Sequence, residues 1–162
     1  MSEPTFLIVE DNDDDAALLR RAFTKSKLLN LIHFVRTADE AVSYLLGTGK
    51  YNNRAEYPFP SLILLDLKLP GMSGHDFLKW IREHPQVRGL RVVVLSGSDD
   101  MRDVSLAYKL GANSFLIKPA DFDRFVEISA ALGGFWLWLD QAPESHLDLH
   151  NVSQTHAATR RT

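Results

Sequence analysis

The sequence predicts an α/β protein in which helices cover both faces of a five-stranded parallel sheet. Five short apolar runs alternate with five amphipathic segments, and each connection is long enough for a crossover between parallel strands. The run 62–65, Leu-Ile-Leu-Leu, lies between Pro60 and Pro70, which is typical of a central strand buried on both faces. Right-handed crossovers then give a doubly wound sheet with strand order 2-1-3-4-5.

Each element follows from its own apolar pattern and flanking residues. The expected strands are residues 5–9, 31–35, 62–65, 90–95 and 114–117. The first helix is expected to be capped by an Asp or Asn of the acidic run 10–15 and to end near Lys25. The other expected helices are residues 38–46, 75–83, 99–110 and 121–132. Ser73 with Asp76 three residues later resembles a capping pair at the start of the third helix. Gly111 fits the position just after the end of the fourth helix.

Composition narrows the classes of function. A chain of 162 residues has room for one domain, and a net charge of -3 with both signs mixed argues against a nucleic-acid binder. The absence of cysteine excludes disulfides, thiolate metal sites and cysteine nucleophiles. No secretory signal and no apolar segment of membrane-spanning length is visible, so we expect a cytoplasmic protein without membrane contact.

Polar side chains stand where four of the expected strands end. They are Glu10 and Asp11, Asp66, Ser96 and Lys118. The carboxyl ends of parallel strands share one edge of the sheet, where ligands bind in open α/β folds, so these side chains should converge. Taken singly, each has an ordinary alternative: Asp66 caps a turn, Ser96 begins a helix and Lys118 is a solvated turn residue.

Converging carboxylates constrain the chemistry of this edge. Two unit charges about 4 Å apart repel by ~4 kcal/mol at an effective dielectric of about 20, which raised pKa values or a cation would relieve. Oxygen ligands without His or Cys suit Mg²⁺ or Mn²⁺. With Lys118 as a second positive charge, the set suits phosphoryl transfer, with Asp66 as the nucleophile that forms an aspartyl phosphate.

In this order the motifs resemble the receiver domain of two-component response regulators. The matching positions, over about residues 5–132, are Glu10-Asp11, Asp66 followed by Pro70 and Gly74, Ser96, and Lys118-Pro119. The resemblance implies a flavodoxin-like fold. Asn12, the long loop before the third strand and Phe-Trp-Leu after the last helix resemble, more narrowly, the stand-alone receivers paired with bacterial phytochromes.

The resemblance also implies roles for individual residues. Asp66 would accept a phosphoryl group from a sensor histidine kinase, with a bacteriophytochrome as the candidate kinase. Glu10, Asp11, Asp66 and the backbone carbonyl of Lys68 would bind Mg²⁺. The remaining assignments are Ser96 and Lys118 as ligands of the phosphoryl oxygens and Phe115 as the switch aromatic residue, which works together with Ser96. Such a protein signals and loses its phosphoryl group slowly, and is not a metabolic enzyme.

Two rival functions stay open at this point. The chain could be a receiver-shaped binding module that is never phosphorylated, although all the acidic and lysine positions are filled. It could also be a phosphohydrolase, but such enzymes place a second acid two residues after the nucleophile, where this chain has Lys68. Phe115 has its own alternative, because it alternates with Leu116 and could simply belong to the core.

Two segments lie outside the predicted site. Residues 47–60 form a long polar loop that leads to the amino end of a strand, so we expect a surface for contacts there. Residues 133–139, Gly-Gly-Phe-Trp-Leu-Trp-Leu, extend the last helix with apolar groups on every side. They predict a homodimer interface, the alternative being that they fold back over the base of the domain. We therefore expect a receiver domain over residues 1–140 and a disordered tail over 141–162.

Overall fold

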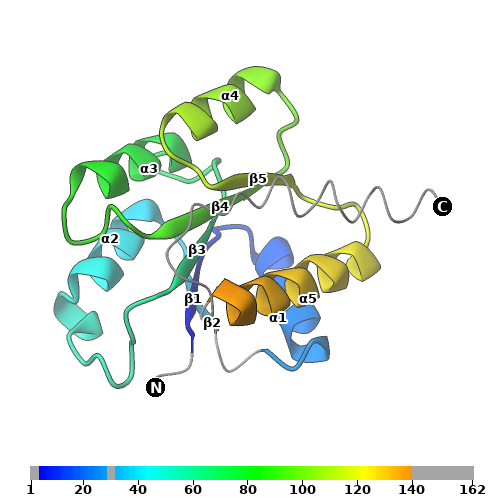
Figure 1. Ribbon diagram of the computed structural model, residues 1–162, viewed down its shortest axis with the longest axis horizontal. Helices are drawn as coiled ribbons and strands as arrows, with labels where there is room; N and C mark the ends of the chain where they lie inside the picture. The colour runs from blue at the N-terminus through cyan, green and yellow to red at the C-terminus, as the bar shows by residue number, and fades with distance from the viewer. Residues whose placement is uncertain (1–3, 29–31, 140–162) are drawn as a thin grey trace.

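The computed structural model describes residues 4–28 and 32–139 of the chain, with side chains as far as residue 134. Within this part the strands form a five-stranded parallel sheet in the order β2-β1-β3-β4-β5, which confirms the predicted fold (Figure 1). The strands are β1 (Phe6–Val9), β2 (Ile32–Val35), β3 (Leu62–Leu65), β4 (Arg91–Ser96) and β5 (Ser114–Ile117). The helices are α1 (Asp13–Lys25), α2 (Ala38–Leu46), η2 (Gly49–Tyr51), α3 (Gly74–Glu83), α4 (Met101–Lys109) and α5 (Phe122–Leu139).

Two hydrophobic cores lie on opposite faces of the sheet. Successive residues of a strand point to opposite faces, so Leu7 and Val9 join the core under α2, α3 and α4, whereas Phe6 and Ile8 join the core under α1 and α5. Figure 1 shows α1 and α5 together on one side of the sheet and the other three long helices opposite. All four residues of β3 are buried, as the sequence predicted for a central strand.

Helix ends follow from capping side chains. α1 begins at Asp13, within the acidic run, and its N-cap is Asn12, whose side chain accepts a hydrogen bond from the Asp15 N–H. This confirms the expectation that an Asp or Asn of that run caps the helix. α4 begins at Met101 instead of residue 99, because Asp100 is its N-cap. The predicted pairing of Ser73 with Asp76 is confirmed, since the Ser73 hydroxyl accepts from the Asp76 N–H at 3.1 Å.

The 47–60 loop packs against its own side of the domain. Tyr51 is buried, and its ring centroid lies 5.0 Å from those of Tyr44 and Tyr57. The Arg54 guanidinium donates to the backbone carbonyls of Tyr44 and Leu45, both at 2.8 Å, near the end of α2. The loop is therefore a folded extension of α2, and not only the polar surface segment that we predicted.

α5 continues beyond residue 132 as far as Leu139. A Cβ atom at Gly133 would overlap a Leu28 methyl carbon, so the start of the apolar segment packs against the same chain. The side chains of residues 135–139, on which the predicted dimer interface depends, and the predicted tail at 141–162 lie outside the described residues.

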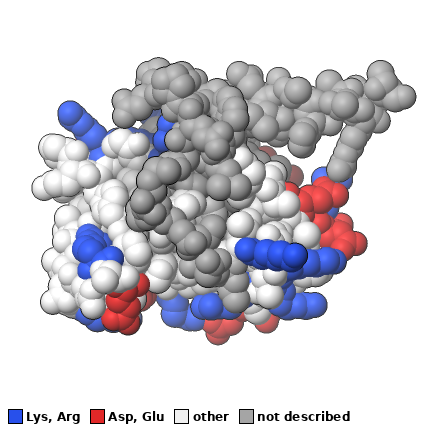
Figure 2. Space-filling model, turned by 60° about the horizontal axis from the view of Figure 1, so that its bottom comes forward, with Lys and Arg blue, Asp and Glu red and all other residues white. Residues whose placement is uncertain are grey.

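The surface carries charges of both signs. On the face seen in Figure 2, lysine and arginine side chains are interspersed with acidic ones. Among residues 4–28 and 32–139, no helix combines the length and the apolar character needed to cross a bilayer.

Candidate functional site

Sheet hydrogen bonding continues one residue beyond three strands and fixes the backbone of the site. Glu10 N–H donates to Val35 O at 3.0 Å, and Asp66 N–H donates to Val9 O at 3.1 Å. On the other side of β3, Lys118 N–H donates to Ser96 O at 2.8 Å. The predicted convergence of strand ends at one edge of the sheet is therefore present in the structure.

The Lys118 ammonium group lies among three carboxylates at this edge of the sheet. Its Nζ lies 2.9 Å from Glu10 Oε2, 3.0 Å from Asp66 Oδ2 and 2.7 Å from Asp15 Oδ2. The side chains of Glu10, Asp66 and Lys118 are 2%, 7% and 13% exposed, respectively. A buried charge is costly unless it is paired, and here one ammonium offsets several carboxylates.

Burial and pairing shift two pKa values in this cluster. Burial raises the pKa of Glu10 to about 7, with the Asp66 charge adding to the increase, while hydrogen bonds from Lys118 and the Asn12 N–H oppose it. Burial alone would lower the pKa of Lys118, but its hydrogen bonds to Asp15, Glu10 and Asp66 prevail and raise it. Lys118 thus stays an ammonium group, whereas the carboxyl group of Glu10 keeps a raised pKa despite its contact with this ammonium.

Glu10, Asp11 and Asp66 form a candidate metal site. Each contributes one carboxylate oxygen, and the three oxygens lie within 4.8 Å of one another. Carboxylate oxygens grouped this closely suit a hard divalent cation such as Mg²⁺, which prefers oxygen ligands. The oxygen-only donor set and the raised pKa of Glu10 both favour a cation at this position. Lys68 is placed beside it, since its N–H donates to Asp66 Oδ1 at 3.3 Å.

Two residues at the site, Asp15 and Arg36, were not predicted from the sequence. Asp15 reaches Lys118 from the first turn of α1. Arg36, just after β2, forms an ion pair with Asp13 and donates to the Asp11 carbonyl at 3.1 Å. The signal for them in the sequence is the dense run of acidic residues after β1. These negative charges require positively charged groups nearby, but the sequence alone does not show which residues provide them.

Ser96 and Phe115 lie on the β4–β5 side of the site. Ser96 is fully buried, and its Oγ accepts from the Ser98 N–H at 3.3 Å. Phe115 is half-buried beside the core under α2, α3 and α4, and its N–H donates to the Tyr108 hydroxyl at 3.1 Å. Ser98 in turn donates from its hydroxyl to Asp103 Oδ2 at 2.7 Å.

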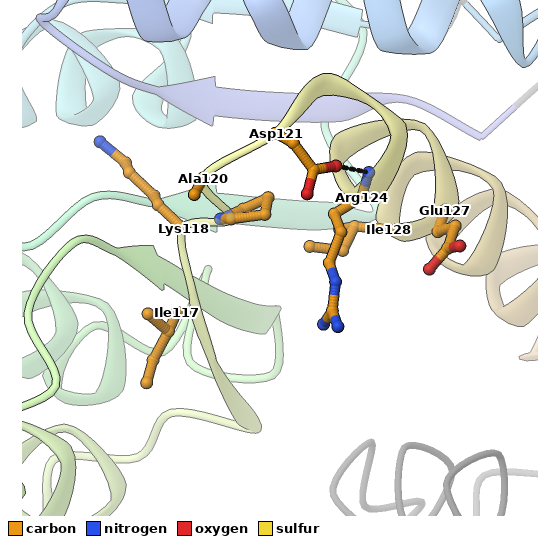
Figure 3. A pocket seen from close by; sticks show the side chains of 8 residues that line it. Ile117, Lys118, Ala120, Asp121, Arg124, Glu127 and Ile128 are labelled. Atoms are coloured by element: carbon orange, nitrogen blue, oxygen red, sulfur yellow. Dashed lines mark hydrogen bonds between the residues drawn. The ribbon is translucent and has the colours of Figure 1, made fainter. Parts of the chain in front are cut away.

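A separate pocket of about 390 Å³ lies beneath the link between β5 and α5. Ile117, Asp121, Arg124 and Ile128 help to line it. Figure 3 shows that the Lys118 side chain points away from Asp121 and Arg124. The Lys118 ammonium group therefore belongs to the acidic cluster.

Comparison with known proteins agrees with this geometry. The pattern of the response regulator receiver domain matches residues 6–130. A curated relative, the probable methanogenesis regulatory protein FilR2 of Methanothrix harundinacea, is 33% identical over 137 residues, which cover 85% of this chain and 86% of the relative.

Two solved structures are similar over most of both chains. The phosphorylated cyanobacterial phytochrome response regulator RcpA is 34% identical with a TM-score of 0.75, covering 84% of this chain and 95% of its own. The Mn²⁺-bound form of Rcp1 from Synechocystis is 31% identical with a TM-score of 0.73, covering 83% of this chain and 95% of its own. This chain therefore belongs to the response regulator receiver domain family, and its relatives include phytochrome response regulators.

Proposed function

We propose that this protein accepts a phosphoryl group on Asp66 from a phosphohistidine of a sensor kinase. The observation that carries the proposal is the placement of the Asp66 carboxylate, which contacts the Lys118 ammonium at 3.0 Å and lies within 4.8 Å of the Glu10 and Asp11 oxygens. A nucleophilic carboxylate beside a fixed ammonium and a cation-binding set is what an aspartyl phosphate requires.

The proposed step is an in-line transfer. An Asp66 carboxylate oxygen attacks phosphorus, the bond between phosphorus and the imidazole nitrogen breaks, and the histidine leaves with the electron pair and takes up a proton. Lys118 offsets the negative charge of the transferring oxygens, and the Ser96 hydroxyl binds one of them once the phosphoryl group is in place.

Mg²⁺ is the proposed cofactor. Glu10, Asp11, Asp66 and the Lys68 backbone carbonyl would hold it, and it would supply positive charge beside the oxygens of the phosphoryl group. The fit of three carboxylate oxygens and the Mn²⁺-bound relative Rcp1 support a divalent cation at this position.

The proposed role is signalling without metabolic turnover. The phosphorylated protein would change its surface through Ser96 and Phe115, and would return to the resting state by slow hydrolysis. Against the phosphohydrolase alternative, the position two residues after Asp66 holds Lys68, which is exposed and offers no general acid.

The proposed partners are a sensor histidine kinase and a second copy of this chain. The phytochrome response regulator RcpA supports a phytochrome as the kinase. A homodimer through residues 133–139 stays a prediction, as do the absence of nucleic-acid binding and a receiver domain over residues 1–140.

Intact mass after incubation with acetyl phosphate and Mg²⁺ tests the proposal. We expect wild type to gain one phosphoryl group and Asp66→Asn to gain none. Asp14→Asn is the matched control, because it removes the same charge from an exposed position near the site and should leave labelling intact. An unlabelled wild type would favour the binding-module alternative, and steady turnover of a phosphate ester that needs Asp66 would favour the phosphohydrolase.

A further inference from the structure

Asp15 is the partner of Lys118 that the proposed step does not use. Its Oδ2 lies 2.7 Å from Lys118 Nζ, closer than Glu10 Oε2 at 2.9 Å or Asp66 Oδ2 at 3.0 Å. The Asp15 side chain is 28% exposed, so it approaches the ammonium from the rim of the site while the other two acids approach from the interior. Asp15 thus adds a third, outer contact to a lysine that is otherwise almost enclosed.

The cap of α1 directs Asp15 toward Lys118. Asn12 Oδ1 accepts from the Asp15 N–H at 2.9 Å, while the Asn12 N–H donates to Glu10 Oε1 at 3.0 Å. In a capping box, an acid at the third helical position would bind the N–H of the N-cap residue. Because Glu10 already accepts that N–H, the Asp15 carboxylate is available to cross to the link between β5 and α5.

The three carboxylates that contact Lys118 differ in whether they also belong to the candidate metal site. An ammonium group has three N–H donors, and three carboxylates surround this one. Glu10 and Asp66 also belong to the set that could hold a cation, and Asp66 is the proposed phosphoacceptor. Asp15 is outside that set, so its contact with Lys118 is compatible both with a bound cation and with a phosphorylated Asp66.

We propose that Asp15 is a positioning residue that keeps the Lys118 ammonium next to Asp66 throughout phosphoryl transfer. This inference rests on the proposed phosphorylation of Asp66 and adds a residue to that reaction. A lysine side chain loses considerable rotamer freedom when it is fixed, and a contact that fixes it beforehand removes this cost from the transfer step.

Asp15→Asn, compared with Asp14→Asn, tests the inference. Both variants remove one negative charge from the first turn of α1, and only Asp15 contacts Lys118. At saturating Mg²⁺ we expect Asp15→Asn to be phosphorylated by acetyl phosphate about tenfold more slowly than Asp14→Asn, the scale of one lost hydrogen bond between charged groups. Equal rates in the two variants would overturn the proposal.

The same two substitutions in a Lys118→Ala background test whether Asp15 affects the rate of phosphorylation through Lys118. If Asp15 acts through Lys118, the two variants become equal there, and a tenfold gap that persists contradicts the inference. Reductive methylation of Lys118, followed by mass spectrometry, provides a readout that does not depend on phosphorylation. Lys118 should be modified faster in Asp15→Asn than in Asp14→Asn, and equal modification would again contradict the contact.

These outcomes separate the inference from the proposed function. A wild-type protein that takes up no phosphoryl group contradicts the function, and the methylation result still decides whether Asp15 restrains Lys118. A phosphorylated wild type with equal Asp15→Asn and Asp14→Asn rates leaves the function standing and removes only the role of Asp15.

Discussion

Two neighbouring helices on the same face of the sheet, α3 and α4, are held in different ways (Figure 1). α3 buries Gly74, Phe77, Leu78 and Ile81, whereas Ala107 is the buried residue of α4. Burial of aromatic and aliphatic side chains fixes α3 to the sheet.

Hydrogen bonds at its two ends hold α4. Near its start, Ser98 donates to Asp103, and near its end, the Tyr108 hydroxyl accepts from the Phe115 N–H. Ser98 also donates its N–H to Ser96, so the same loop contacts the proposed phosphoryl ligand. Weakly packed elements open at lower free energy than the core, so the comparison indicates that α4 moves more readily than α3.

The largest expected difference concerns packing. We expect Phe77→Ala, which empties a fully buried position on α3, to lower the free energy of unfolding by about 3–5 kcal/mol. Leu106→Ala on α4, where the side chain is 42% exposed, should cost about 0.5 kcal/mol or less. Urea denaturation measures both, and similar costs at the two positions would remove the contrast between the helices.

A smaller effect is expected where α3 meets the site. A Cβ atom at Gly74 would lie 2.6 Å from the Asp66 carbonyl oxygen and from Leu67 Cα, and these backbone atoms cannot rotate away. We expect Gly74→Ala to cost about 1–3 kcal/mol, the range for overpacking, and to slow phosphorylation of Asp66. Gly89→Ala, which meets nothing within 4 Å, is the control, and equal stability of the two variants would contradict the close approach.

Ser98→Ala should loosen α4 and leave α3 unchanged. The variant loses the hydrogen bond to Asp103, at a net cost of about 1 kcal/mol. Hydrogen exchange of the α4 amides should become faster while exchange in α3 stays the same. Ser105→Ala, at an exposed position of α4, should have no such effect. Faster exchange in both helices would mean that they move as one unit.

Tyr108→Phe tests the other end of α4 and should give the smallest change. Removing the hydroxyl leaves the Phe115 N–H without this acceptor, in an exposed setting where a lost bond costs about 0.5–1 kcal/mol. Exchange of the Phe115 amide should accelerate relative to that of Leu116 in the same strand. Unchanged exchange would show that water replaces the hydroxyl at no cost.

The sequence predicted the sheet because its signals were local and repeated. Apolar runs, their spacing and the strand-end residues Glu10, Asp66 and Lys118 are sufficient to place a site once the strands are parallel. Each of these residues directly follows the last residue of a strand, so backbone topology alone brings them together.

The contributions of Asp15 and Arg36 depended on side-chain direction, which the sequence does not specify. Asp15 could have closed a capping box, and only the engagement of the Asn12 N–H by Glu10 leaves it for Lys118. Arg36 likewise could have pointed to solvent, and its ion pair with Asp13 depends on how β2 and α1 are placed across the sheet edge.

The hydrogen bonds of Arg54 to the end of α2 matter for the design of chimeric receiver domains. Its guanidinium occupies the carbonyls of Tyr44 and Leu45 at the last turn of α2, and Gly47, with φ of 66°, leaves room for it. Replacing residues 47–60 by a short connector would strip those acceptors of their donor at a half-buried position. In a chimera, α2 and the loop that follows it should therefore come from the same parent protein.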